Sequence, residues 1–104
     1  MIITTSEKIA GREVVETIGL VRGSTVRAKH IGNDIMATLK NIVGGEIEEY
    51  TKLQTDAREQ AIARMTKNAV EVGADAIIST RLESSMIAGG ASEIVAYGTA
   101  VKLQ

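Results

Sequence analysis

The feature that most constrains this chain is a long stretch in which small apolar residues recur at helical spacing. Within residues 48–73 the recurring positions are Leu53, Ala57, Ala61, Met65, Ala69 and Val72. Steps of four and three place them on one side of an α-helix, which predicts a single buried face. Because most of them are alanines, this helix can lie very close to a sheet. Thr51 and Gln54 match a capping box, and Gly73 suits the left-handed position after the helix.

Most of the remaining sequence favours β-structure. Strands are predicted over residues 2–5, 13–29, 74–87 and 92–103. Gly19 and Gly23 interrupt the second of these, and glycine inside a strand usually marks a bulge or a bend, so we expect one curved strand. The sequence AGGA at 88–91 predicts a hairpin connection between the last two strands.

A second, shorter helix is predicted before the long one. It starts at a cap formed by Asn33 or Asp34 and ends at Gly44 and Gly45. With 104 residues the chain has the size of one domain, covering 1–104. The predicted fold class is therefore α+β, with a curved antiparallel sheet around a long helix.

The last strand is apolar on both sides. One side carries Ile94, Ala96, Gly98 and Ala100, with Lys102 at its end, and the other carries Val95, Tyr97, Thr99, Val101 and Leu103. A sheet with one face in water alternates apolar and polar residues, and this strand does not. The small side fits beneath the alanine-rich helix. The larger side needs more cover than one short helix supplies, which predicts a neighbouring subunit.

The composition argues against several classes of function. The formal net charge is −1, with charges of both signs interspersed, and aromatic residues make up 2% of the chain. That gives neither the electrostatic field nor the stacking platforms of a nucleic-acid binder. The absence of cysteine removes disulfides, thiolate catalysis and soft sulfur ligands. No stretch has the length and apolar character of a membrane span, and no secretory signal is evident, so we expect a cytoplasmic protein without membrane partners.

Several stretches resemble the YbjQ-like family of small uncharacterised prokaryotic proteins. They are TT near the start, VVETIGLVRG, GGEIEEYTKLQTDAREQAIARM and GADAIISTRLESS, and the match extends over nearly the whole chain. The resemblance implies a subunit similar to that of dodecin and assembly into a ring-like homo-oligomer, a pentamer. The family is often labelled "putative heavy-metal-binding", but no ligand set behind that label can be carried over to particular residues.

Five residues are the candidate metal ligands: His30, Asp34, Glu46, Glu48 and Glu49. The three glutamates immediately precede the long helix, where the helix dipole favours negative charge by about 0.3 to 1 kcal/mol per group. We therefore interpret them first as helix-start electrostatics. His30 is the only histidine, and one imidazole per chain becomes a ring of ligands for zinc, copper or nickel if it faces the axis of an assembly. The cofactor is unknown, with a divalent metal ion as the candidate.

No nucleophile with a matching base emerges from the sequence. The two helix arginines, Arg58 and Arg64, are predicted to form solvated ion pairs with Asp56 and Glu59, or alternatively to bind an anion between subunits. The favoured function is a homo-oligomeric binding or scaffold protein that holds a metal ion or small ligand at subunit interfaces. A small enzyme with an intersubunit active site is the alternative.

Overall fold

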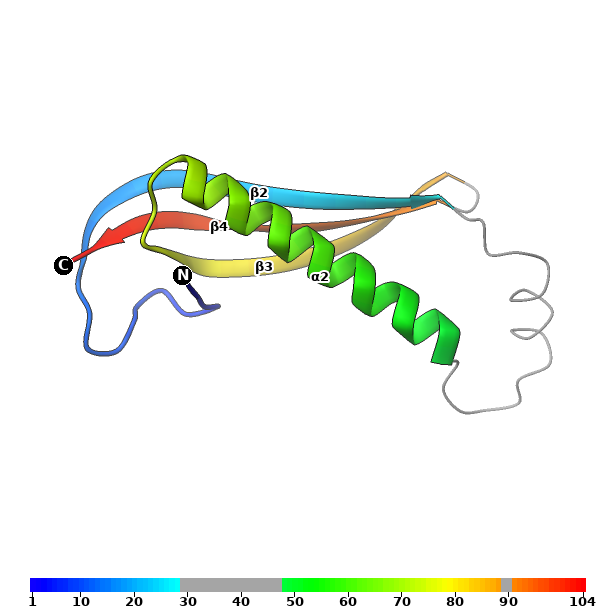
Figure 1. Ribbon diagram of the computed structural model, residues 1–104, viewed down its shortest axis with the longest axis horizontal. Helices are drawn as coiled ribbons and strands as arrows, with labels where there is room; N and C mark the ends of the chain where they lie inside the picture. Colours follow the sequence, from blue (N-terminus) through cyan, green and yellow to red (C-terminus); the bar gives the residue numbers. More distant parts are fainter. Residues whose placement is uncertain (29–47, 89–90) are drawn as a thin grey trace.

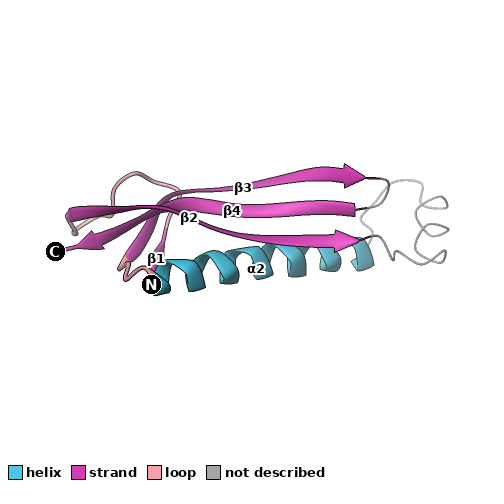
Figure 2. Ribbon diagram, turned by 90° about the horizontal axis from the view of Figure 1, so that it is seen from above, coloured by secondary structure: helices cyan, strands magenta, loops and turns pink. Residues whose placement is uncertain are grey.

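A computed structural model describes residues 1–28, 48–88 and 91–104 of the chain. It has two layers, because one long helix lies across one face of a four-stranded sheet (Figures 1 and 2). The elements are β1 (Ile2–Ile3), β2 (Val14–Ala28), α2 (Glu48–Glu71), β3 (Ala76–Ala88) and β4 (Ala91–Leu103). The α+β class is confirmed. The second helix predicted between residues 33 and 44 lies outside the described residues.

The strand order in the sheet is β1-β3-β4-β2, and the sheet is open. The three long strands pair antiparallel, as predicted, with β4 in the middle. The short strand β1 pairs in parallel with the start of β3, so the sheet is mixed and the prediction of a purely antiparallel sheet was wrong in this respect. Ala88 pairs directly with Ala91, which agrees with the predicted hairpin.

The two ends of α2 differ in how well the sequence predicted them. The helix begins at Glu48, three residues before the predicted cap, so Thr51 lies inside it. Glutamate is a good helix former and is favoured in the first turn, which explains the earlier start. At the other end Gly73 has a φ of 79° and donates to the Val70 carbonyl over 3.0 Å. Ala74 donates to Ala69 over 3.0 Å, which completes a Schellman motif and confirms the predicted role of Gly73.

The helix buries the face that the spacing predicted. Its fully buried positions are Ala57, Ala61, Met65 and Ala69. Leu53, nearer the start of the helix, is half-buried. Val72 was predicted to belong to the same stripe but is 42% exposed, because the helix ends at Glu71 and the chain then turns away. The small side of β4 is buried beneath the helix as predicted, at Ile94, Ala96, Gly98 and Ala100.

The two glycines of β2 have different roles. Gly19 has a φ of 139° and lies at a register shift between β2 and β4, which confirms the predicted bulge. Gly23 lies in regular register. A Cβ there would clash with the backbone atoms Met65 N and Ala61 O of the helix. The bulge or bend expected at Gly23 was therefore wrong, and its small size instead allows α2 to touch the strand.

The larger side of β4 faces away from the helix. Val101 is buried there within the single chain, whereas the other four positions, Val95, Tyr97, Thr99 and Leu103, are half-buried. The side chains of β2 and β3 on either side of this central strand provide that partial cover. Whether a neighbouring subunit completes it stays a prediction.

Candidate functional site

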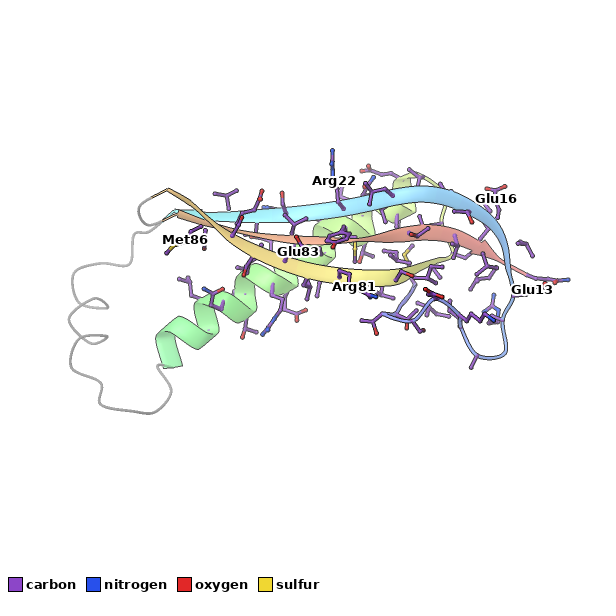
Figure 3. The ribbon with its side chains drawn as sticks, turned by 180° about the vertical axis from the view of Figure 1, so that it is seen from behind. Glu13, Glu16, Arg22, Arg81, Glu83 and Met86 are labelled. Carbon is purple, nitrogen blue, oxygen red and sulfur yellow. The ribbon has the colours of Figure 1, made fainter. Side chains whose placement is uncertain are left out.

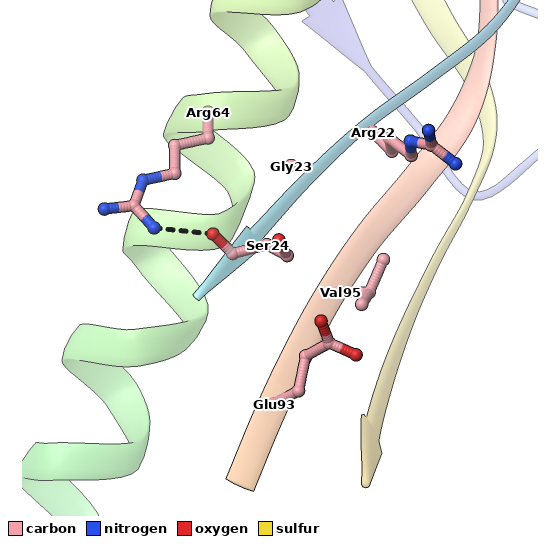
Figure 4. Close-up of a pocket in the computed structure, with 6 residues that line it drawn as sticks. All are labelled: Arg22, Gly23, Ser24, Arg64, Glu93 and Val95. Carbon is pink, nitrogen blue, oxygen red and sulfur yellow. Dashed lines mark hydrogen bonds between the residues drawn. The ribbon is translucent and has the colours of Figure 1, made fainter. Parts of the chain in front are cut away.

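A groove of about 550 Å³ opens beside β2. Its lining residues are Arg22, Gly23, Ser24, Arg64, Glu93 and Val95 (Figure 4). Gly23 brings the helix backbone against the strand, and this close approach places Arg64 beside the edge of β2. The groove therefore follows from the packing of α2 on a strand that lies at the edge of the sheet.

The polar contacts in this groove connect the helix to the strand backbone. Arg64 Nη1 donates to the Ser24 carbonyl oxygen over 2.6 Å (Figure 4), and the Arg22 backbone N–H donates to Asn68 Oδ1 over 3.1 Å. The sequence did not predict this contact of Arg64 with a backbone carbonyl. The alternative of an anion bound between subunits stays a prediction. Arg58, the other helix arginine, donates from Nη2 to the Thr55 hydroxyl over 3.3 Å. The contacts of Arg64 and Asn68 thus satisfy backbone groups of an edge strand.

Arg22 and Arg64 do not form one anion site. The register places Arg22 directly opposite Tyr97, on the sheet face that points away from the helix. Arg64 comes from the helix on the other side of the strand (Figure 4). Because the two guanidinium groups lie on opposite sides of β2, they cannot converge on a single ligand. The groove is better explained as part of the helix–strand contact than as a binding pocket.

The outer face of the sheet carries a second polar cluster, formed by Arg81, Glu83 and Tyr97. Figure 3 labels Arg81 and Glu83 of this cluster. The Tyr97 hydroxyl donates to Glu83 Oε1 over 3.0 Å. This hydrogen bond to Glu83, together with desolvation and the carboxylate's negative charge, raises the pKa of Tyr97 above its ordinary value, while Arg81 opposes the shift. The cluster is exposed to solvent and therefore resembles an ordinary cross-strand surface network.

Arg81 also ties the N-terminal segment to β3. Its Nη1 donates to the Thr5 carbonyl over 3.1 Å and to the Thr80 carbonyl over 2.9 Å. Next to it Ser79 has a φ of 52°, at a register shift between β3 and β4. Near this shift β3 lies close to Gly98 of β4. A Cβ added to Gly98 would lie 2.7 Å from Ile77 Cγ2. Sequence reasoning missed this junction, because nothing in the alternation of the strand signals a bulge without glycine.

The predicted metal ligands are not brought together by the described part of the structure. His30, Asp34 and Glu46 lie outside the described residues, and Glu48 and Glu49 are the first two residues of α2. Within residues 1–28, 48–88 and 91–104 no group of three or more His, Cys, Asp or Glu residues could hold a metal ion. The described residues therefore do not provide a site that fits a heavy metal.

Sequence comparisons place the chain among uncharacterised proteins. A family model described as "Putative heavy-metal-binding" matches residues 1–104. A relative from Archaeoglobus fulgidus, named UPF0145 protein, is 57% identical over 104 residues, covering 100% of this chain and 96% of the relative. A protein of the same name from Methanosarcina acetivorans is 53% identical over 103 residues, covering 99% and 97%. Neither name states an activity.

A solved structure supports the fold. The crystal structure of a protein of unknown function from Pediococcus pentosaceus matches with a TM-score of 0.66 and 17% identity, covering 100% of this chain and 98% of that one. At that identity the likeness shows the fold alone. In the described part of this chain no helix combines the length and apolar character that crossing a membrane requires.

Proposed function

This chain belongs to the YbjQ-like family described as "Putative heavy-metal-binding", and we propose that it is a cytoplasmic homo-oligomeric binding or scaffold protein. In this proposal several copies form a ring, with five as the number that the family resemblance implies. A metal ion or a small ligand would be held where subunits meet.

The observation that carries the assembly is the extended shape of the single chain. Its radius of gyration is 17.1 Å and its extents are 54 × 24 × 16 Å. A compact chain of the same length has a radius of gyration of about 13 Å. The accessible surface is 6957 Å², whereas a monomeric protein of this mass exposes about 5,600 Å². The single chain therefore exposes more surface than a compact monomeric protein of the same mass.

This surplus is of the size that subunit contacts remove. The difference between the two areas is about 1,400 Å². A stable interface buries about 800 Å² on each partner, and every subunit of a ring takes part in two interfaces. Two such contacts would bury about 1,600 Å² per subunit, which is enough to cover the surplus. The assembly is thus supported by the area that the single chain exposes.

The metal part of the proposal rests on residues 30–49 and on the family description, because the described residues assemble no ligand group. One imidazole per chain is a weak ligand set for one subunit. Repeated around a symmetry axis, the same residue supplies several ligands to one ion. The candidates for this role remain His30, Asp34, Glu46, Glu48 and Glu49.

Sedimentation velocity at low micromolar concentration tests the assembly, and a thermal-shift panel of divalent cations on the same sample tests the ligand. We expect one species larger than a dimer, and a rise in melting temperature with one cation that is lost in His30→Ala or in a combined Glu46, Glu48 and Glu49 to glutamine variant. A folded monomer would overturn the assembly. Unchanged melting across the panel, in a sample that still sediments as a ring, would overturn metal binding alone.

A further inference from the structure

Described residues cover the outer edge of β3 along only part of its length. At its start β1 pairs with Ala76 and Ile77. The covering segment then continues, since Thr4 N–H donates to the Ile77 carbonyl and Thr80 N–H donates to the Thr4 carbonyl, each over 3.0 Å. The bond from Arg81 to the Thr5 carbonyl fixes the end of this cover. The N-terminal segment thus protects the edge up to Thr80. Figure 1 shows this segment beside the start of β3.

Beyond that point the register shows which backbone groups face outward. In an antiparallel pair, successive residues direct their N–H and C=O groups alternately toward the partner strand and away from it. Thr80 directs its N–H away from β4, toward Thr4. The regular pairing from Leu82 to Met86 therefore directs the backbone of Leu82, Ser84 and Met86 outward in the same way. We call these three residues the open β3 edge.

In the described part of the chain, the outward backbone groups of the open β3 edge have no hydrogen-bond partner. The side chains of these three residues are uncharged. Leu82 is 44% exposed and Met86 is 83% exposed, and Met86 lies near the far end of the strand (Figure 3). Monomeric proteins guard such edges with charged side chains, lysine above all, or with proline. Residues 82–88 carry one charged residue, Glu83, and no lysine, and the whole chain contains no proline.

At the opposite edge of the sheet, formed by β2, side chains of the helix bind backbone groups of the strand. On β2 the outward N–H of Arg22 is bound by Asn68 and the outward carbonyl of Ser24 is bound by Arg64. Side chains of α2 therefore occupy the middle of that edge, where a partner strand would have to displace them. Because side chains of α2 bind the middle of the β2 edge and no described residue binds the open β3 edge, strand addition is favoured at β3.

We propose that the open β3 edge is an interaction surface at which a second copy of this chain adds a β-strand. This inference deepens the proposed homo-oligomer by naming the surface, and it rests on that proposal. A second copy is the occupant that the area supports, because the single chain exposes a surplus comparable with what subunit contacts bury. Main-chain hydrogen bonds to Leu82, Ser84 and Met86 would hold the added strand, and the exposed Leu82 and Met86 side chains would pack beside it.

The test replaces one outward N–H without touching the strand pairing inside the chain. Ser84→Pro removes an N–H that points away from β4, and proline is tolerated on an edge in that orientation. Ser84→Thr is the matched control, because it keeps the N–H and suits a strand. We expect Ser84→Pro to sediment as a folded monomer, or to need at least tenfold more protein to assemble, while Ser84→Thr assembles like the wild type. A folded Ser84→Pro variant that assembles normally would overturn the proposal and leave the homo-oligomer standing.

Hydrogen exchange on the assembled wild-type protein gives an answer that does not depend on whether a variant folds. The Ser84 amide should be protected by the added strand, whereas the Ser24 amide, which points outward on β2, should exchange quickly. Protection of Ser84 that is lost on dilution to the monomer supports the proposal. Equally fast exchange at Ser84 and Ser24 in the assembled protein would place the partner elsewhere. A wild type that is monomeric at every concentration would overturn the homo-oligomer itself.

Discussion

Leu20 and Val21 are neighbours in β2, yet Val21 is 1% exposed and Leu20 is 66% exposed. Val21 points toward α2 and packs in the core, while Leu20 points to the opposite face of the sheet. The same contrast holds for β4, whose small residues are buried under the helix and whose larger residues are mostly half-buried. The helix side of the sheet is completed within one chain. On the outer face, the same chain leaves most large side chains exposed or half-buried.

The largest expected effect lies where helix and sheet are closest. Gly23→Ala would place a methyl group against Met65 N and Ala61 O, which are backbone atoms and cannot rotate away. We expect the free energy of unfolding to fall by about 3 kcal/mol or more, because the helix must move off the strand. Urea denaturation at fixed protein concentration measures this loss.

Ser24→Ala, one residue further along β2, is the control for Gly23→Ala. Ser24 is exposed, and the atom that binds Arg64 is its backbone carbonyl oxygen, which alanine keeps. A Gly23→Ala protein as stable as Ser24→Ala would contradict the close contact between β2 and α2.

A smaller effect on the free energy of unfolding distinguishes the two faces of the sheet. Val21→Ala removes two buried methyl groups and should lower the free energy of unfolding by about 2 kcal/mol. Leu20→Ala removes more atoms from the next residue but should change it by less than about 0.5 kcal/mol, because Leu20 is exposed. Paired urea titrations measure both. Equal losses would mean that another copy covers the outer face as fully as α2 covers the inner one.

The described helix and strands were predicted well because buried residues recur along the sequence at the spacing of a helix or a strand. Ala57, Ala61, Met65 and Ala69 repeat with the helix, and the strands of the described chain match the predicted ranges closely. The buried side of β4 was predicted for the same reason.

What the sequence could not predict depends on partners far apart in the chain. Gly23 has the same sequence signature whether it forms a bulge or touches a helix, and only the position of Met65 decides between them. The bond from Arg64 to Ser24 joins residues 40 positions apart. Of the candidate metal ligands, the described structure places only Glu48 and Glu49, at the start of α2, so the metal site stays a prediction.

The smallest effect is expected on the outer face, at the hydrogen bond from Tyr97 to Glu83. The bond raises the pKa of Tyr97 above its unfolded value of about 10. A group whose pKa is raised on folding contributes stability that is fully present below the unfolded pKa and is lost as the pH rises through the folded one. The urea midpoints of wild type and Tyr97→Phe should therefore differ by a small, constant amount from neutral pH to about pH 9, and the difference should vanish at higher pH.

An absorbance titration reads the same bond without unfolding the protein. The chain has two tyrosines, so in a Tyr50→Phe background the phenolate signal comes from Tyr97 alone. Its midpoint should lie above about 10 and should fall when Glu83→Gln removes the carboxylate charge but keeps an acceptor. Because Tyr97 lies on the face that a single chain leaves open, the titration should also be the same in the ring and in the Ser84→Pro monomer. A midpoint that rises on assembly would show that the second copy lies across the outer face, against the proposed pairing at the open β3 edge.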